Sequence, residues 1–145
     1  MLVTIYTDAS YNPKNHKAAG AAWIRSNRGT LRVRKKMKGV SNPTSAEAYI
    51  INYAIRYAYS KWPDATVIFV NTDSLNVCKF MWEFNNSEPK NKQLKIIIDY
   101  IKKFGKHYQL EYRFKHVKAH TNKKDIRSWL NRWCDQNAKE TRKIK

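Results

Sequence analysis

Hydrophobic and polar residues follow different spacings along the chain, and each spacing predicts a type of element. In segment 30–38 apolar residues alternate with basic ones, as in a strand with one solvated face. Val67-Ile68-Phe69-Val70 is a continuous apolar run, which is typical of a central strand covered on both sides. Between Ile126 and Trp133 apolar side chains recur at helical intervals. The chain therefore combines strands and helices.

Together these spacings predict an ordered series of elements. They are strands at about residues 2–9, 18–26 and 30–38, a helix at 44–61, a strand at 67–70, helices at 74–84 and 92–104, a strand at 109–116 and a helix at 125–142. A hairpin followed by βαβ units implies a mixed sheet with helices packed on its faces, so the fold class is α/β. No repeat or flexible linker interrupts the 145 residues, so we expect a single domain over residues 1–145.

The charge balance points to a partner, because the chain holds 29 Lys and Arg against 11 Asp and Glu, a net charge of +18. A compact domain with so much like charge repels itself, so we expect it to bind an anionic molecule. Nucleic acid and an anionic membrane surface both meet this requirement. A composition that is 42% hydrophobic and 13% aromatic argues against disorder.

The location of the protein is inferred from segments that the chain lacks. No stretch is long and apolar enough to span a bilayer, and the N-terminal run reaches Asp8 too early to serve as a signal segment. Cys78 and Cys134 have no metal-ligand spacing, so we expect buried, reduced thiols. These features predict a cytoplasmic protein that does not bind membranes, with a monomer as the default state.

Two aspartates follow predicted strands. Asp8 closes the first strand, and Asp73 closes the strand that contains the apolar run. If these strands are parallel neighbours, both carboxylates emerge at the carboxyl edge of the sheet, where α/β folds bind ligands. Either residue alone is better explained as a turn or helix-capping aspartate, and Asp73 would cap the helix that follows it. Together they support a metal-site hypothesis.

Two further carboxylates carry a weaker signal. Glu47 shares the apolar stripe of its helix with Ile50 and Ala54, and a buried carboxylate needs a partner. A capping box from Thr44 to Glu47 explains the same residue about equally well, so the pattern leaves both interpretations open. Asp135 lies off the apolar stripe of its helix, and its position alone favours a solvated charge.

Clustered carboxylate oxygens without cysteine or clustered histidine favour a hard divalent cation, Mg²⁺ or Mn²⁺. Two such ions about 4 Å apart can hold the attacking and leaving oxygens of a phosphoryl displacement. A basic surface would then hold the phosphate backbone of a nucleic acid. The residues are therefore compatible with a metal-dependent nuclease.

Five motifs along the chain resemble, in order and approximate spacing, those of type 1 ribonuclease H. They are Thr7-Asp8-Ala9-Ser10, the helix with Glu47, Thr72-Asp73-Ser74, Val117-Lys118-Ala119-His120 and Asn131-Arg132-Trp133-Cys134-Asp135. The resemblance covers essentially the whole chain and implies a ribonuclease H-like fold, a five-stranded mixed sheet flanked by helices. It also implies hydrolysis of the RNA strand of RNA–DNA hybrids by two Mg²⁺ ions, with Mn²⁺ as a possible substitute, leaving 5′-phosphate ends.

The resemblance assigns roles to individual residues. It implies that Asp8, Glu47, Asp73 and Asp135 are metal-binding catalytic carboxylates. It implies that His120, on a mobile loop, assists proton transfer or product release. The spacing alone would leave His120 an ordinary loop histidine.

Several positions depart from the usual family pattern. Ala9 and Ala119 replace glycines, which could strain turns near the metals. About five additional residues separate His120 from Asp135. The basic protrusion with which many bacterial members grip the hybrid is shortened to the segment 85–92. These departures predict a different grip on the substrate.

A hybrid is recognised by the shape of its groove, because the RNA strand presents 2′-hydroxyls across a wide, shallow minor groove. Asn12, Asn42 and Thr44 are the polar loop residues that we expect to contact it. Two alternatives remain: a DNA nuclease of the same fold, similar to an integrase or a junction resolvase, and a hybrid-binding module without activity. His120 and the turn Asn12-Pro13 favour the hybrid nuclease, and four intact carboxylates argue against an inactive module.

Overall fold

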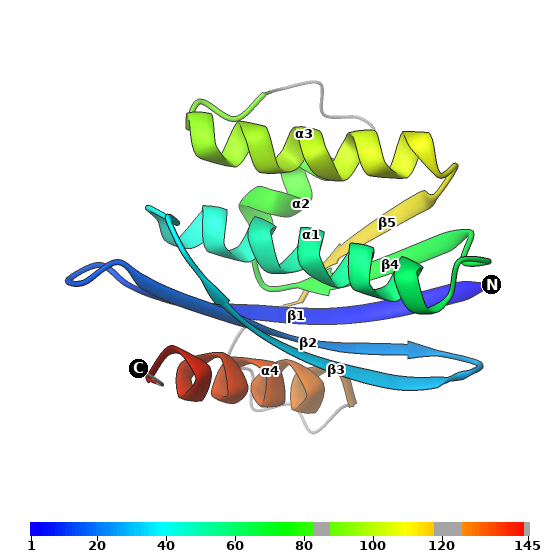
Figure 1. Cartoon of the computed structure of the whole chain (residues 1–145), viewed down its shortest axis with the longest axis horizontal. Helices are drawn as coiled ribbons and strands as arrows, with labels where there is room; N and C mark the ends of the chain where they lie inside the picture. The colour runs from blue at the N-terminus through cyan, green and yellow to red at the C-terminus, as the bar shows by residue number, and fades with distance from the viewer. Residues whose placement is uncertain (83–87, 118–125, 144–145) are drawn as a thin grey trace.

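The structure is a computed structural model that describes residues 1–82, 88–117 and 126–143, with only the backbone described for residues 126–128, 130 and 131. These residues form nine elements (Figure 1). They are β1 (Leu2–Asn12), β2 (Lys17–Ser26), β3 (Gly29–Met37), α1 (Pro43–Lys61), β4 (Val67–Thr72), α2 (Leu75–Met81), α3 (Lys92–His107), β5 (Glu111–His116) and α4 (Ile126–Lys143). The predicted order of strands and helices is confirmed.

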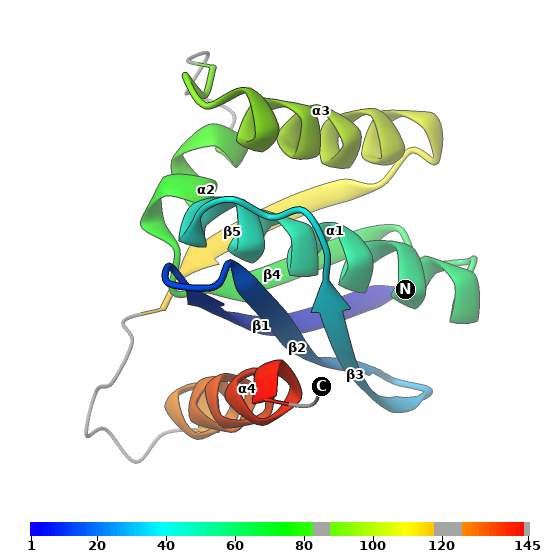
Figure 2. The ribbon, with the colours of Figure 1, turned by 60° about the vertical axis from the view of Figure 1, so that its left-hand side comes forward.

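The strands form one mixed sheet in the order β3-β2-β1-β4-β5. β2 pairs with β1 and β3 in antiparallel register, whereas β4 pairs with β1 and β5 in parallel register. Helices α1, α2 and α3 lie on one side of the sheet and α4 on the other (Figures 1 and 2). The α/β fold predicted from the sequence, a five-stranded mixed sheet flanked by helices, is confirmed.

The main core lies between the sheet and α1. Val3 and Ile5 of β1 and Ile68 and Val70 of β4 are fully buried in one cluster with the apolar side of α1. The opposite side of the apolar run is only half-buried at Val67 and Phe69, because α4 packs mainly on β1 and β2. Burying this apolar surface is the main driving force for closing α1 onto the sheet.

A glycine sets the close approach of α1 to the sheet. A Cβ added at Gly20 of β2 would lie 2.6 Å from Cβ of Ile50, so only glycine fits at this crossing. Ile50 is in the second turn of α1, just after Glu47. Gly20 therefore lets the second turn of α1 come close to β2 at the point where β2 pairs with Ala9, next to Asp8.

Two predicted boundaries are wrong in an informative way. β1 does not end at residue 9 but continues to Asn12, because its antiparallel pairing with β2 extends to Asn12↔Lys17. The parallel pairing with β4 ends at Tyr6↔Asn71. Asp8 is therefore inside β1, just beyond the point where β4 leaves it. α2 ends at Met81, earlier than the predicted residue 84, and the residues after Trp82 lie outside the described part.

Two further expectations from the sequence concern the state of the cysteines and membrane-spanning helices. Cys78 and Cys134 are buried free thiols. No helix within the described ranges has the length and apolarity needed to cross a lipid bilayer.

Candidate metal centre

Three carboxylates from distant parts of the chain meet at the carboxyl end of the parallel strands. Asp8, Glu47 and Asp73 each offer an oxygen, and these oxygens lie within 4.8 Å of one another. Asp8 and Asp73 hold equivalent places, since each follows the last β1–β4 pair, Tyr6↔Asn71, by two residues. The parallel register thus brings the two aspartates together, and α1 supplies the glutamate.

The amide of Ala9 orients two of these carboxylates. Its N–H donates to Asp8 Oδ1 at 2.9 Å and to Glu47 Oε1 at 3.1 Å. Glu47 Oε2 is buried without a hydrogen-bond partner among the described residues. A buried carboxylate oxygen without a donor is unfavourable unless a proton or a cation completes its surroundings.

The capping box proposed for Glu47 is not formed. Asn42 is the N-cap of α1, and its side chain accepts a hydrogen bond from the amide of Ser45 at 2.8 Å. Glu47 therefore turns to β1 rather than back to Thr44. Of the two interpretations that the pattern left open, the geometry supports the carboxylate that faces the site.

Asp73 is also not a helix cap. The N-cap of α2 is Ser74, whose Oγ accepts from the amide of Val77 at 3.3 Å. The main chain of Asp73 is held instead from β5, since His116 Nε2 lies 3.1 Å from its carbonyl oxygen. The side chain of Asp73 is left to face Asp8 and Glu47.

Burial and mutual repulsion make these groups reluctant to ionise. Burial, with the charge of Asp73 as the next cause, raises the pKa of Asp8 to about 8. Burial and the charges of Asp8 and Asp73 raise the pKa of Glu47 well above its usual value. Burial and the charge of Asp135 raise the pKa of Asp73. Without a cation, this cluster cannot carry its full negative charge at neutral pH.

Asp135 of α4 lies beside the three-residue cluster. Its side chain is 25% exposed, and its Oδ2 is 3.1 Å from Lys139 Nζ, one helical turn away. It is near enough to raise the pKa of both Asp8 and Asp73. Asp135 is therefore at the rim of the site, and not only the solvated charge that its helical position favours. His120 lies outside the described residues.

The donor set fits a hard divalent cation. Its oxygens are all carboxylate, one of them is buried without a partner, and no cysteine or histidine of the described residues joins the group. Such a set suits Mg²⁺ or Mn²⁺ better than zinc. Ala9 causes no strain next to it, because Ala9 is in a paired strand and has no positive φ.

A pocket of about 470 Å³ lies at the start of α1, and some of its lining residues are close in sequence to Glu47. Two of the residues expected to contact a hybrid, Asn42 and Thr44, line it. Its other lining residues are Asn76, Phe80, Glu88, Lys90, Asn91 and Leu94, and three of them belong to the segment 85–92 that replaces the basic protrusion. Asn12 is not part of it. Asn12 is the last residue of β1, and its side chain accepts from the amide of Lys14 in the turn that follows, at 2.9 Å.

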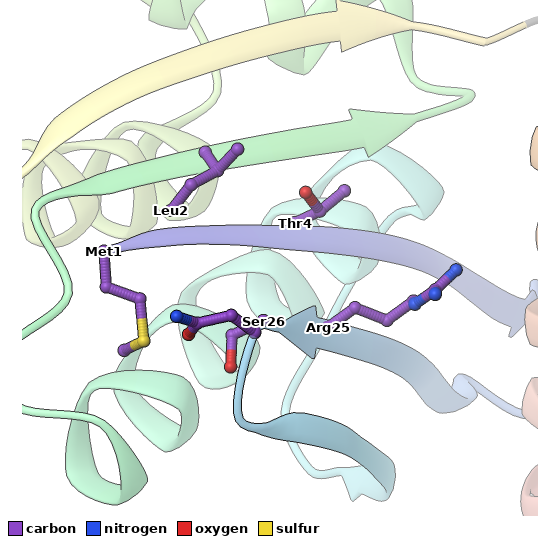
Figure 3. Close-up of a pocket in the computed structure, with 6 residues that line it drawn as sticks. Met1, Leu2, Thr4, Arg25 and Ser26 are labelled. Carbon is purple, nitrogen blue, oxygen red and sulfur yellow. The ribbon is translucent and has the colours of Figure 1, made fainter.

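A second pocket lies at the other end of β1 (Figure 3). It measures about 390 Å³ and is lined by Met1, Leu2, Thr4, Arg25, Ser26 and Asn27. None of these residues is acidic, so this pocket has no part in the metal centre.

One family of known proteins matches the sequence. The sequence model of the RNase H family matches residues 2–143. No curated protein sequence matches significantly.

Solved structures share the fold at low identity. The RNase H1 of the archaeon Halobacterium salinarum has a TM-score of 0.75 at 17% identity, with 97% of each chain covered. The N-terminal RNase H domain of a Mycobacterium tuberculosis protein has a TM-score of 0.76 at 16% identity, over 97% of this chain and 93% of that one. LC11-RNase H1, from compost, was solved with an RNA/DNA hybrid and has a TM-score of 0.75 at 18% identity, covering 95% of this chain and 94% of its own.

Proposed function

Because the chain belongs to the RNase H family, we propose that it is an endonuclease that hydrolyses the RNA strand of RNA–DNA hybrids and leaves 5′-phosphate ends. The observation that carries this proposal is the cluster of Asp8, Glu47 and Asp73 within 4.8 Å, with one buried oxygen that has no hydrogen-bond partner among the described residues. A fold neighbour that was solved with an RNA/DNA hybrid supports the choice of substrate.

Asp8, Glu47 and Asp73 would hold the metal, with Asp135 as a further ligand at the rim. Two Mg²⁺ or Mn²⁺ ions bound there would polarise the scissile phosphate and lower the pKa of the attacking water. The chain itself supplies the orientation of the ligands. The amide of Ala9 holds one oxygen of Asp8 and one of Glu47, which would leave the other oxygen of each for an ion.

Two residues would act around this centre. Asp135 is paired with Lys139, and a bound cation would compete with Lys139 for its carboxylate. We also propose that His120 assists proton transfer or product release, which rests on the family motif alone.

The substrate would be held by polar groups outside the carboxylate cluster. Asn42 and Thr44 at the start of α1 and Asn12 at the end of β1 would contact the hybrid in its minor groove. Lys90, which lines the pocket, would neutralise a backbone phosphate. The net charge of +18 favours association with any polyanion, so these polar contacts have to provide the preference for a hybrid.

The test is a cleavage assay on three duplexes of one sequence: an RNA–DNA hybrid, a DNA duplex and an RNA duplex. We expect cuts in the RNA strand of the hybrid with Mg²⁺ or Mn²⁺, and none in excess chelator. Equal cutting of the DNA duplex would instead identify a DNA nuclease of the same fold. Tight hybrid binding without cleavage in any divalent metal would identify a binding module.

A further inference from the structure

Tyr11 makes a contact that the metal centre does not use. It lies in the extension of β1 beyond Asp8, and its hydroxyl donates to the carbonyl oxygen of Ser41 at 2.9 Å. The same hydroxyl lies 2.7 Å from His16 Nδ1. A phenol has one hydrogen, and here it is directed to Ser41, so Nδ1 of His16 must carry the proton and donate to the Tyr11 oxygen. One hydroxyl therefore joins two loops.

The two loops are those that carry the residues proposed to contact the hybrid. His16 ends the turn that starts after Asn12, and its amide donates to the Asn12 carbonyl at 2.8 Å. Ser41 immediately precedes Asn42, the N-cap of α1. Tyr11 thus links Asn12 and Asn42 through one neighbour of each.

The Ser41 side of this link is itself held in place. The amide and the hydroxyl of Ser41 donate to Oε1 of Gln93, at 3.0 and 2.9 Å. Nε2 of Gln93 donates to the carbonyl of Gly39 at 2.6 Å. The loop before α1 is therefore tied to the first turn of α3, and Tyr11 extends this tie to the β1–β2 turn.

The turn that contains His16 depends more on the Tyr11 hydroxyl than the Ser41 loop does. His16 has φ of 56°, a left-handed conformation that a residue with a Cβ rarely adopts. Besides its bond to Tyr11, the His16 ring packs against the Tyr11 ring, with centroids 6.1 Å apart. Without the hydroxyl, the turn would lose the bond that connects it to the loop before α1.

We propose that Tyr11 is a positioning residue that sets the spacing between Asn12 and Asn42 before the hybrid arrives. The inference rests on the proposed function, because it assumes that both residues contact the hybrid. A surface formed in advance binds more tightly, since less conformational freedom is lost on binding. Among the described residues the Tyr11 hydroxyl bonds to Ser41 and His16 and to none of the three carboxylates, so its loss should weaken binding and leave the chemical step intact.

The experiment compares Tyr11→Phe with Tyr112→Phe. The control loses the same kind of bond elsewhere, because the Tyr112 hydroxyl donates to the carbonyl of Ile101 at 2.9 Å. For Tyr11→Phe we expect KM for the hybrid to rise about 3- to 10-fold, the effect of one hydrogen bond, with kcat within about twofold. Tyr112→Phe should leave both constants unchanged when it is assayed well below its unfolding temperature.

A second variant, at His16, tests the imidazole bond to Tyr11 separately from the left-handed backbone conformation. Asparagine adopts the left-handed conformation readily but is too short to replace the imidazole, so His16→Asn should raise KM as Tyr11→Phe does. An unchanged KM in Tyr11→Phe, or a fall in kcat alone, overturns the inference while the proposed function stands. If the wild type neither cuts nor binds the hybrid, the proposed function fails and the inference fails with it.

Discussion

The amide of Ala9 donates to Glu47 Oε1 at 3.1 Å, which joins the C-terminal half of β1 to the N-terminal part of α1. This bond forms where the parallel pairing of β1 with β4 has ended, so the amide has no strand partner on that side. The departure of β4 thus creates both the opening for a metal and the donor that orients its ligands. The bond also explains why Glu47 faces the site instead of closing a capping box.

Loss of one carboxylate should abolish turnover without abolishing binding. We expect Asp73→Asn to lower kcat by more than about 100-fold, because the amide keeps the shape but removes a charged metal ligand. Affinity for the hybrid in excess chelator should stay within about threefold, since the basic surface is unchanged. Single-turnover cleavage and fluorescence anisotropy measure the two effects.

The matched control for this variant is Asp64→Asn. Asp64 forms a half-exposed ion pair with Arg28 at 2.6 Å, and such pairs contribute little. Near-wild-type turnover in Asp73→Asn, or an equal loss in Asp64→Asn, would contradict the site.

The metal-free protein should lose stability as the pH rises. The pKa of Asp8 is raised from 3.8 to about 8 in the folded state, so the folded protein binds a proton more tightly than the unfolded chain. The stability associated with this proton is fully present below pH about 4 and is lost as the pH rises to about 8. In chelator, Asp8→Asn should therefore raise the unfolding temperature at pH 8 by about 2–4 °C per kcal/mol recovered, and less at pH 5.

The same variant gives a test of the metal. Mg²⁺ should stabilise the wild type at pH 8 more than it stabilises Asp8→Asn, because the ion offsets the repulsion that the variant has already reduced. Thermal unfolding at both pH values, with and without Mg²⁺, measures this. A wild type that is most stable at pH 8 in chelator would mean that the carboxylates are not crowded.

Much of the fold could be predicted from the sequence, because the type of each long segment follows from the spacing of the apolar residues that it buries. The order of elements could be predicted, and so could the carboxylate sites at Asp8 and Asp73, which depend on two parallel strands having a common edge. The extension of β1 to Asn12 could not, since it results from pairing with β2 over residues that resemble a turn. Local pattern carries no information on such long-range pairing.

The side-chain geometry of the site was less predictable. The pattern left Glu47 undecided, because a capping box and an inward carboxylate require the same residue at the same place. Asp135 looked solvated, since one helix cannot reveal how near α4 lies to β1. The pocket at Asn42 combines residues from three elements, including Asn76 and Asn91, and nothing in the spacing connects them.

The capping assignment predicts different consequences at two neighbouring residues. Asn42→Ala should destabilise the protein by about 1 kcal/mol, because it removes the acceptor for the amide of Ser45. Thr44→Ala should leave stability nearly unchanged, since Thr44 is not the cap. Both should weaken hybrid binding if the pocket contacts the substrate. Urea unfolding separates the two, and equal destabilisation would restore Thr44 as the cap.

Salt should weaken hybrid binding steeply, and the slope can locate the contacts. Each phosphate neutralised by a cation contributes about −0.9 to the slope of log affinity against log salt concentration, so three or more contacts give a slope of about −2.7 or steeper.

Two lysine variants show where these contacts are. Lys90 lines the pocket at the start of α1, whereas Lys61 lies at the far end of α1, 5.5 Å from the centre of the Tyr57 ring. Lys90→Gln and Lys61→Gln change the net charge equally. If the pocket holds a phosphate, only Lys90→Gln should reduce the slope, by about one unit, when binding is titrated in chelator. Equal changes in the two variants would mean that the hybrid responds to overall charge and not to this pocket, and a flat salt response would remove the basic surface from the account of binding.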